Sequence, residues 1–298
     1  MTAPRTEKFG ISAAITTPFT QTGAVDTALL CAHAKSVLDQ GCASVTLGGT
    51  TGEGPSLSLS ETIPAYKALT AASIDPSKIV FGILQSALPD AIEAARQVSS
   101  LGCKYILVAP PYYFKGVSDA GQVAWFDQFL TAISDTGLNV ILYHIPQMTA
   151  APITPDMVGA IIKAHPSMIA GVKDSSGDWD NAMTLLDRFS DRHILIGDER
   201  MLGAAIKRGA SGAICGVANI APGLLIPLLD GKEPDKNLTP LVNALLEYPV
   251  TPVIKALVAH VTDTPAWRRV RAPLVELDQG QYELITNTYN RLFESGND

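Results

Sequence analysis

The chain has 298 residues, of which 47% are hydrophobic and 17% charged, enough apolar material for one large domain or two small ones. Its formal net charge of -7 and the lack of a basic cluster argue against a nucleic-acid-binding protein. No window reaches the roughly 18 apolar residues of a membrane span, and residues 1–8 lack a signal-peptide core, so we expect a soluble, cytoplasmic protein with no membrane partner.

Residue types that bind metals are dispersed along the chain. The cysteines have no metal-ligand spacing and are expected to be small buried hydrophobic residues, and the histidines form no pair at helical spacing. The residues concerned are Cys31, Cys42, Cys103 and Cys215, and His33, His144, His165, His193 and His260. We therefore expect no metal site.

Short apolar runs alternate with longer amphipathic patterns from the first residues to about residue 220. The expected strands are residues 11–15, 44–47, 79–83, 105–108, 139–143, 168–173, 194–196 and 212–214. The clearest helical patterns between them are residues 28–40, 88–101, 122–134 and 155–165. Gly41, Gly102 and Gly209 stand where helices usually end.

Eight such units, with strands apolar on both faces, predict a (β/α)₈ barrel of the TIM type. The alternative is a doubly wound open sheet, but no G-x-G-x-x-G opens a helix after an early strand. No further strand-like runs follow after about residue 221, and we expect helices at residues 224–229, 238–247, 253–260 and 281–293. Residues 1–221 should form the barrel, and residues 222–298 should pack on it as C-terminal helices of the same structural unit.

Catalytic groups of such a barrel lie at the C-terminal ends of its strands. The loop at residues 48–54 (GGTTGEG) exposes successive backbone N–H groups and two hydroxyls, a natural cradle for a carboxylate or phosphate. Tyr143 ends the fifth strand, either as a core tyrosine or as a proton relay. Lys173 ends the sixth, where burial favours the neutral amine that attacks a ketone; the alternative is a lysine that reaches water.

Several motifs, in consistent order over nearly the whole chain, resemble the dihydrodipicolinate synthase/N-acetylneuraminate lyase family of Schiff-base class I aldolases. The matching segments are residues 49–53 (GTTGE), 111–113 (PYY), 143–146 (YHIP), 171–175 (GVKDS), 197–198 (GD) and 209–214 (GASGAI). Residues 52–58 and 111–114 are more similar to the 2-keto-3-deoxy sugar acid aldolase branch than to the synthase.

The resemblance implies that Lys173 forms an imine with pyruvate or another 2-keto acid and that Tyr143 is the neighbouring acid/base. The imine acts as an electron sink that stabilises the enamine at C3 and permits reversible C–C bond formation. No dissociable cofactor is implied.

The resemblance also assigns the surroundings of the imine. The backbone N–H groups of Thr50 and Thr51 would hold the α-carboxylate of the keto acid, and the Ile214 carbonyl would line the site. The Thr50 hydroxyl would link Tyr143 to Tyr113 of a neighbouring subunit, which implies a homodimer or homotetramer.

The chain also departs from the family pattern. The synthase carries an arginine two positions after its Tyr-Asn-x-Pro proline, which binds the carboxylate of aspartate semialdehyde; here Met148 stands there and cannot do so. His144 replaces the usual asparagine, and we expect it to be a structural hydrogen-bonding residue. Glu199 either binds the hydroxyls of a polyhydroxylated aldehyde, assisted by Gln147 and Arg200, or is a solvated charge on a loop.

These observations predict a pyruvate-dependent aldolase or lyase that cleaves or forms a C–C bond of a 2-keto-3-deoxy sugar acid or related hydroxy-keto acid. Its substrates would be pyruvate and an aldehyde. Three alternatives stay open: 4-hydroxy-tetrahydrodipicolinate (dihydrodipicolinate) synthase acting on aspartate semialdehyde, a 2-keto-3-deoxy sugar acid dehydratase, and a non-catalytic keto-acid binding protein. The last would bind a keto acid without an adduct that borohydride traps.

Overall fold

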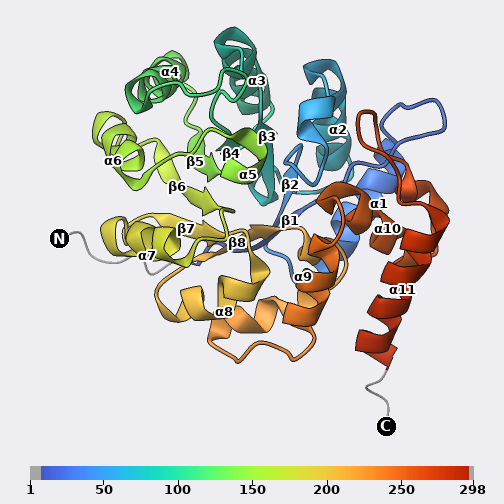
Figure 1. The fold of residues 1–298 in the computed structure, drawn as a ribbon. Coiled ribbons are helices and arrows are strands. Elements are labelled where there is room, and N and C mark those ends of the chain that lie inside the picture. Colours follow the sequence, from blue (N-terminus) through green and yellow to red (C-terminus); the bar gives the residue numbers. More distant parts are fainter. Residues whose placement is uncertain (1–7, 295–298) are drawn as a thin grey trace.

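A closed barrel of eight parallel strands forms the centre of the molecule, in a computed structural model that describes residues 8–294 (Figure 1). Each strand pairs with the next in the chain, and the last pairs with the first, which confirms the predicted (β/α)₈ fold. The strands are β1 (Gly10–Ala14), β2 (Ser44–Leu47), β3 (Ile79–Ile83), β4 (Tyr105–Val108), β5 (Asn139–His144), β6 (Ile169–Asp174), β7 (His193–Ile196) and β8 (Gly212–Cys215).

Helices surround the barrel and continue beyond its last strand. They are α1 (Thr27–Asp39), α2 (Leu59–Ala71), α3 (Leu88–Ser100), α4 (Asp119–Ala132), α5 (Pro146–Thr149), α6 (Pro155–Ala164), α7 (Trp179–Arg188), α8 (Glu199–Lys207), α9 (Leu238–Leu246), α10 (Val250–Val261) and α11 (Gln279–Glu294). Gly41, Gly102 and Gly209 follow α1, α3 and α8 with positive φ angles, as their places in the sequence predicted.

Three predicted helices differ from the structure, and the one expected at 253–260 begins three residues earlier, at Val250. The helix expected at 122–134 begins at Asp119, because the Ser118 side chain accepts a hydrogen bond from the N–H of Gly121 and so caps an earlier turn. The helix expected at 224–229 is instead two short 3₁₀ segments, Pro222–Leu224 and Ile226–Asp230. Pro227 lacks the N–H that a continuous helix needs at this point, which accounts for the break.

Alternation along the strands separates two layers of core. On β5, Ile141 and Tyr143 point into the barrel, whereas Val140 and Leu142 pack against the surrounding helices. On β6, Val172 belongs to the outer layer, so the next residue, Lys173, points inward. The strand period of two therefore directs both predicted catalytic side chains into the same barrel mouth.

The C-terminal helices pack on the barrel unit, with α10 and α11 on the side that carries α1 (Figure 1). Trp267, between them, is fully buried and meets the His33 ring of α1 edge-on at 4.9 Å between ring centroids. Arg271 forms an ion pair with Glu61 of α2 and donates to the carbonyl of Ser56. These contacts tie the tail to the first part of the barrel.

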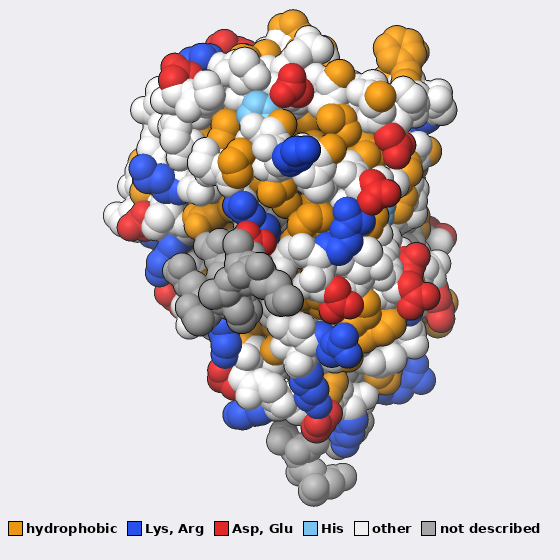
Figure 2. Space-filling view, turned by 90° about the vertical axis from the view of Figure 1, so that its left-hand side faces the viewer, with side chains coloured by type: hydrophobic (Ala, Val, Ile, Leu, Met, Phe, Trp, Pro, Cys, Tyr) orange, Lys and Arg blue, Asp and Glu red, His pale blue; other side chains and the backbone are white. Residues whose placement is uncertain are grey.

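The described surface is mixed in charge where the space-filling view shows it. On the side that is leftmost in Figure 1, lysine and arginine are interspersed with aspartate and glutamate (Figure 2). Within residues 8–294, no helix combines the length and apolar character needed to cross a membrane.

Candidate active site

Lys173 and Tyr143 are neighbours at the C-terminal ends of β6 and β5, where their Cα atoms are register partners. Lys173 is 5% exposed and Tyr143 1%. The Lys173 Nζ lies 4.2 Å from the centroid of the Tyr143 ring. Lys173 therefore does not extend into bulk water, as a lysine that only caps a strand would, but is held inside the barrel against an aromatic face.

Gly171 explains how β6 brings this lysine to the rim. A Cβ atom at residue 171 would overlap the backbone carbonyl of His193 on β7. Only glycine permits the two strands to approach so closely two residues before Lys173. Gly171 of this motif is thus required by packing.

The loop after β2 faces the same pair of side chains. The Thr50 Oγ1 and the Tyr143 hydroxyl are 3.0 Å apart and share a hydrogen bond. Within residues 8–294, the backbone N–H groups of Thr50 and Thr51 have no hydrogen-bond acceptor. Two free N–H donors beside a buried lysine suit a carboxylate.

The tight fold of this loop depends on Gly54. A Cβ atom there would overlap the carbonyl oxygen of Gly48 at the start of the loop. The loop is also held from outside: Thr251 of α10 donates from its hydroxyl to the Thr50 carbonyl at 3.2 Å, and Lys255 forms an ion pair with Glu53. The side chains of Lys255 and Glu53 are both fully buried.

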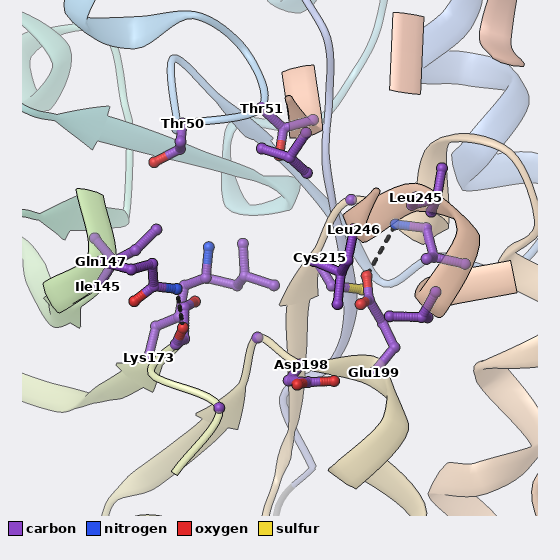
Figure 3. Close-up of a pocket in the computed structure, with 18 of the residues that line it drawn as sticks. Thr50, Thr51, Ile145, Gln147, Lys173, Asp198, Glu199, Cys215, Leu245 and Leu246 are labelled. Carbon is purple, nitrogen blue, oxygen red and sulfur yellow. Dashed lines mark hydrogen bonds between the residues drawn. The ribbon is translucent and has the colours of Figure 1, made fainter. Parts of the chain in front are cut away.

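These groups surround a cavity of about 430 Å³ (Figure 3). That volume is within the range of about 300–1,000 Å³ typical of small-molecule sites. Eight of the nine residues that the sequence suggested for the site line it: Thr50, Thr51, Tyr143, Gln147, Lys173, Glu199, Arg200 and Ile214. In Figure 3, Thr50 and Thr51 lie above the cavity, Gln147 on its left, and Glu199 with Leu245 and Leu246 on its right.

Glu199 is the first residue of α8 and is buried, so the alternative of a solvated loop charge is wrong. One carboxylate oxygen accepts a hydrogen bond from the N–H of Val217 at 2.9 Å. Burial raises the pKa of the Glu199 carboxyl above its usual 4.5, and the Val217 hydrogen bond acts in the opposite direction. The protonated form can donate a hydrogen bond into the cavity.

Arg200 and Gln147, the residues expected to assist Glu199, each make hydrogen bonds within the protein. Arg200 donates to both carboxylate oxygens of Asp198 and to the side chain of Asn243. Gln147 donates to the carbonyl of Ser175. Neither side chain presents a free charge to the cavity.

His144 and Met148 follow the sequence expectations. The His144 Nδ1 accepts a hydrogen bond from the N–H of Ile153 at 3.0 Å, and the residue is buried, as expected of a structural hydrogen-bonding residue. Burial lowers the pKa of His144, with Asp174 acting in the opposite direction. Met148 is 55% exposed and lines the cavity where the synthase pattern has arginine.

Tyr113 does not join the cavity of its own chain. It is 75% exposed and packs edge-on against the equally exposed Phe114, 5.3 Å between ring centroids. Its predicted role in a neighbouring subunit stays a prediction.

The sequence analysis missed the wall that the C-terminal helices contribute. Five apolar side chains from α9 and α10 line the cavity: Val242, Leu245, Leu246, Val250 and Ile254. Their helical spacing was visible in the sequence, but it indicated only an amphipathic helix, because nothing local tells which groove such a helix covers. Lys255 was missed for the same reason.

Metal ligands do not gather in the described part of the chain. Within residues 8–294, no group of three or more His, Cys, Asp or Glu side chains is arranged to hold a metal ion. Cys42, Cys103 and Cys215 are buried as expected, and Cys31 is half-buried.

Comparison with known proteins gives consistent matches over nearly the full length. The model of the dihydrodipicolinate synthetase family matches residues 7–291. An uncharacterised DapA-like lyase of Chloroflexus aurantiacus is 32% identical over 96% of this chain and 97% of its own. The 4-hydroxy-tetrahydrodipicolinate synthase of Staphylococcus carnosus is 30% identical over 94% of this chain and 95% of its own. The crystal structure of dihydrodipicolinate synthase from Agrobacterium tumefaciens has a TM-score of 0.94 at 42% identity, covering 96% of this chain and 100% of that one.

Proposed function

Because this chain belongs to the dihydrodipicolinate synthetase family, and is thus a lyase of the aldolase or synthase type, we propose that it is a pyruvate-dependent class I aldolase. Its reaction joins pyruvate to an aldehyde, or runs in reverse, through an imine on Lys173. The product is a 2-keto-3-deoxy sugar acid or a related 4-hydroxy-2-keto acid. The observation that carries this proposal is the buried Lys173 amine against the Tyr143 ring, in the same cavity as the open loop of Thr50 and Thr51.

Each group has a part in the chemistry. The N–H groups of Thr50 and Thr51 bind the pyruvate carboxylate and direct C2 toward the Lys173 amine. The amine adds to C2, and loss of one water gives the imine. The Tyr143 hydroxyl, hydrogen-bonded to Thr50, transfers protons during this addition and loss of water.

Carbon–carbon bond formation follows from the imine. Loss of a proton from C3 gives an enamine, whose C3 attacks the aldehyde carbon. The aldehyde oxygen takes up one proton and becomes the 4-hydroxyl group. One water then hydrolyses the imine, which releases the 4-hydroxy-2-keto acid and regenerates Lys173. The overall reaction therefore converts one pyruvate and one aldehyde into one molecule of product, with no net gain or loss of water.

The main alternative activity is that of a 4-hydroxy-tetrahydrodipicolinate synthase, the name of several relatives, and Met148 argues against this activity. Aspartate semialdehyde carries a carboxylate that needs a cation at the acceptor end of the site. Met148 is neutral, and Arg200 is already paired with Asp198. A dehydratase would use the same imine to eliminate water from its substrate. Identifying the product distinguishes this reaction from C–C bond cleavage by an aldolase.

The first experiment is intact-protein mass spectrometry after borohydride reduction with pyruvate. We expect a stable adduct on the wild type and none on Lys173→Ala, because reduction fixes only an imine. Lys236→Ala, which removes an exposed lysine far along the chain, is the matched control and should retain the adduct.

The outcomes separate the enzyme from the binding protein. If folded wild type binds pyruvate without forming an adduct, the aldolase proposal fails and a keto-acid binding protein replaces it. An adduct that persists in Lys173→Ala would place the nucleophile elsewhere.

A further inference from the structure

The cavity differs in polarity between the part around Lys173 and the part where the aldehyde acceptor would bind, which we call the acceptor end. The lining around Lys173 is mixed, with the polar groups of Thr50, Thr51 and Tyr143 beside Ile145 and Ile214. The wall formed by α9 and α10 is apolar throughout, with Val242, Leu245, Leu246, Val250 and Ile254. Met148 of α5 contributes a further apolar side chain to the cavity lining.

The charged and amide side chains of the lining are hydrogen-bonded within the protein, while the hydroxyls of Ser175 and Ser176 also line the cavity. Arg200 makes two hydrogen bonds to Asp198 and one to Asn243. Gln147 donates to the Ser175 carbonyl, and one Glu199 oxygen accepts from Val217. An acceptor with several hydroxyl groups would have to compete with these internal hydrogen bonds for Arg200 and Gln147, and burying unpaired hydroxyls is unfavourable.

The apolar side chains, in contrast, have surface left to cover. Leu246 is 56% exposed and Met148 55%, and both line the cavity that contains Lys173. The cavity of about 430 Å³ has room for pyruvate and a second small molecule beside it. An apolar group placed there would remove these side chains from water.

We infer that the aldehyde partner carries an apolar alkyl or aryl group, which binds against Met148, Leu246 and the α9–α10 wall. This inference rests on the proposed function and narrows it: among 4-hydroxy-2-keto acids, the site is built for those with an apolar tail. Glu199, together with the hydroxyls of Ser175 and Ser176, provides the hydrogen-bonding groups that remain in the lining.

The test compares aldehydes of different polarity with the purified enzyme and pyruvate. Initial rates of hydroxy-keto acid formation are measured with benzaldehyde, isobutyraldehyde, D-glyceraldehyde and aspartate semialdehyde, and products are identified by mass spectrometry. We expect kcat/KM for benzaldehyde to exceed that for D-glyceraldehyde by about tenfold or more, and aspartate semialdehyde to be the poorest acceptor.

Two matched variants locate the effect. Leu246→Ser removes an apolar side chain from the wall and should lower kcat/KM for benzaldehyde by about tenfold, without changing the yield of the borohydride adduct with pyruvate. Leu284→Ser removes a similarly exposed leucine (63%) from α11, outside the cavity lining, and should leave both values unchanged.

The results distinguish failure of the inference about the acceptor from failure of the aldolase proposal. A trapped pyruvate adduct together with a preference for D-glyceraldehyde overturns this inference and leaves the aldolase proposal standing. A trapped adduct with an unchanged benzaldehyde rate in Leu246→Ser also overturns it, because the wall would not touch the acceptor. Absence of the adduct removes the proposed function and this inference together.

Discussion

At the scale of single residues, Glu199 combines an acidic side chain with a buried position. Desolvation favours its neutral form and raises its pKa above 4.5, while the Val217 N–H favours the carboxylate. Because the folded-state pKa lies above the unfolded one, folding takes up a proton between the two values. The free energy of unfolding therefore falls as pH rises from about 4.5 through the folded-state pKa.

Glu199→Gln should remove this pH dependence. Glutamine has nearly the same shape and retains an oxygen for Val217, but it does not ionise. We expect the stability of the variant relative to wild type to increase as pH rises above about 4.5. Urea unfolding at about pH 4.5 and at about pH 7.5 measures the difference, and Glu93→Gln, at an exposed carboxyl on α3, is the control. A constant difference between Glu199→Gln and wild type would contradict the buried, protonated acid.

Sequence reasoning reached some residues of the site and not others for a physical reason. Lys173 and Tyr143 end apolar runs, so a barrel fold alone directs them to one rim. The burial of Glu199 depends instead on where α8 begins and on the distant Val217 N–H. A local pattern contains neither fact, which is why its solvated alternative stayed open.

At the scale of elements, α10 packs against one side of the loop at residues 48–54, called the threonine loop below. Thr251 and Lys255 are one helical turn apart, so both side chains face that loop. Lys255 donates to the carbonyl of Thr17 and pairs with Glu53, which has a left-handed backbone at φ 56°. Burial lowers the pKa of the Lys255 ammonium group, and the Glu53 carboxylate opposes this. The element thus fixes the loop whose N–H groups we propose for the keto-acid carboxylate.

Lys255→Met should destabilise the protein by about 3–5 kcal/mol, because it leaves the Glu53 carboxylate buried without its cation. The double variant Lys255→Met/Glu53→Gln should lose less than the sum of the single losses, since neither charge then remains unpaired. Urea unfolding of the set measures the coupling free energy. Lys67→Met, at an exposed position on α2, should shift stability by less than about 0.5 kcal/mol. Additive losses would show that the pair is not coupled.

The strands and most helices followed from their periodicity, because burial on both faces or on one stripe leaves a local record in the sequence. The segment at 224–229 did not, since its apolar content suits a helix while Pro227 interrupts the hydrogen bonds. The packing of α10 against the threonine loop is a tertiary contact between residues about 200 positions apart. Helical spacing cannot specify such a contact.

At the scale of the whole molecule, the exposed pair Tyr113 and Phe114 bears on assembly. Both rings are 75% exposed, on the loop between β4 and α4. Large exposed aromatic side chains often mark protein–protein contacts. We propose that Tyr113 enters the site of a neighbouring subunit and completes a proton relay with Thr50 and Tyr143, which makes the site dependent on a homodimer or homotetramer.

Subunit complementation tests this arrangement. Tyr113→Ala and Lys173→Ala should each be nearly inactive in aldehyde condensation, but a hybrid of the two has one complete site, with Lys173 from one chain and Tyr113 from the other. In a random mixture of dimers half are hybrids, so activity should recover to about one quarter of the wild-type value. Mixing Lys173→Ala with Tyr143→Phe is the matched control, because both lesions fall in the site of the same chain and no hybrid site is complete. Recovery in the first mixture alone requires Tyr113 to act across the interface, whereas full activity of Tyr113→Ala by itself, or no recovery in either mixture, contradicts the shared site.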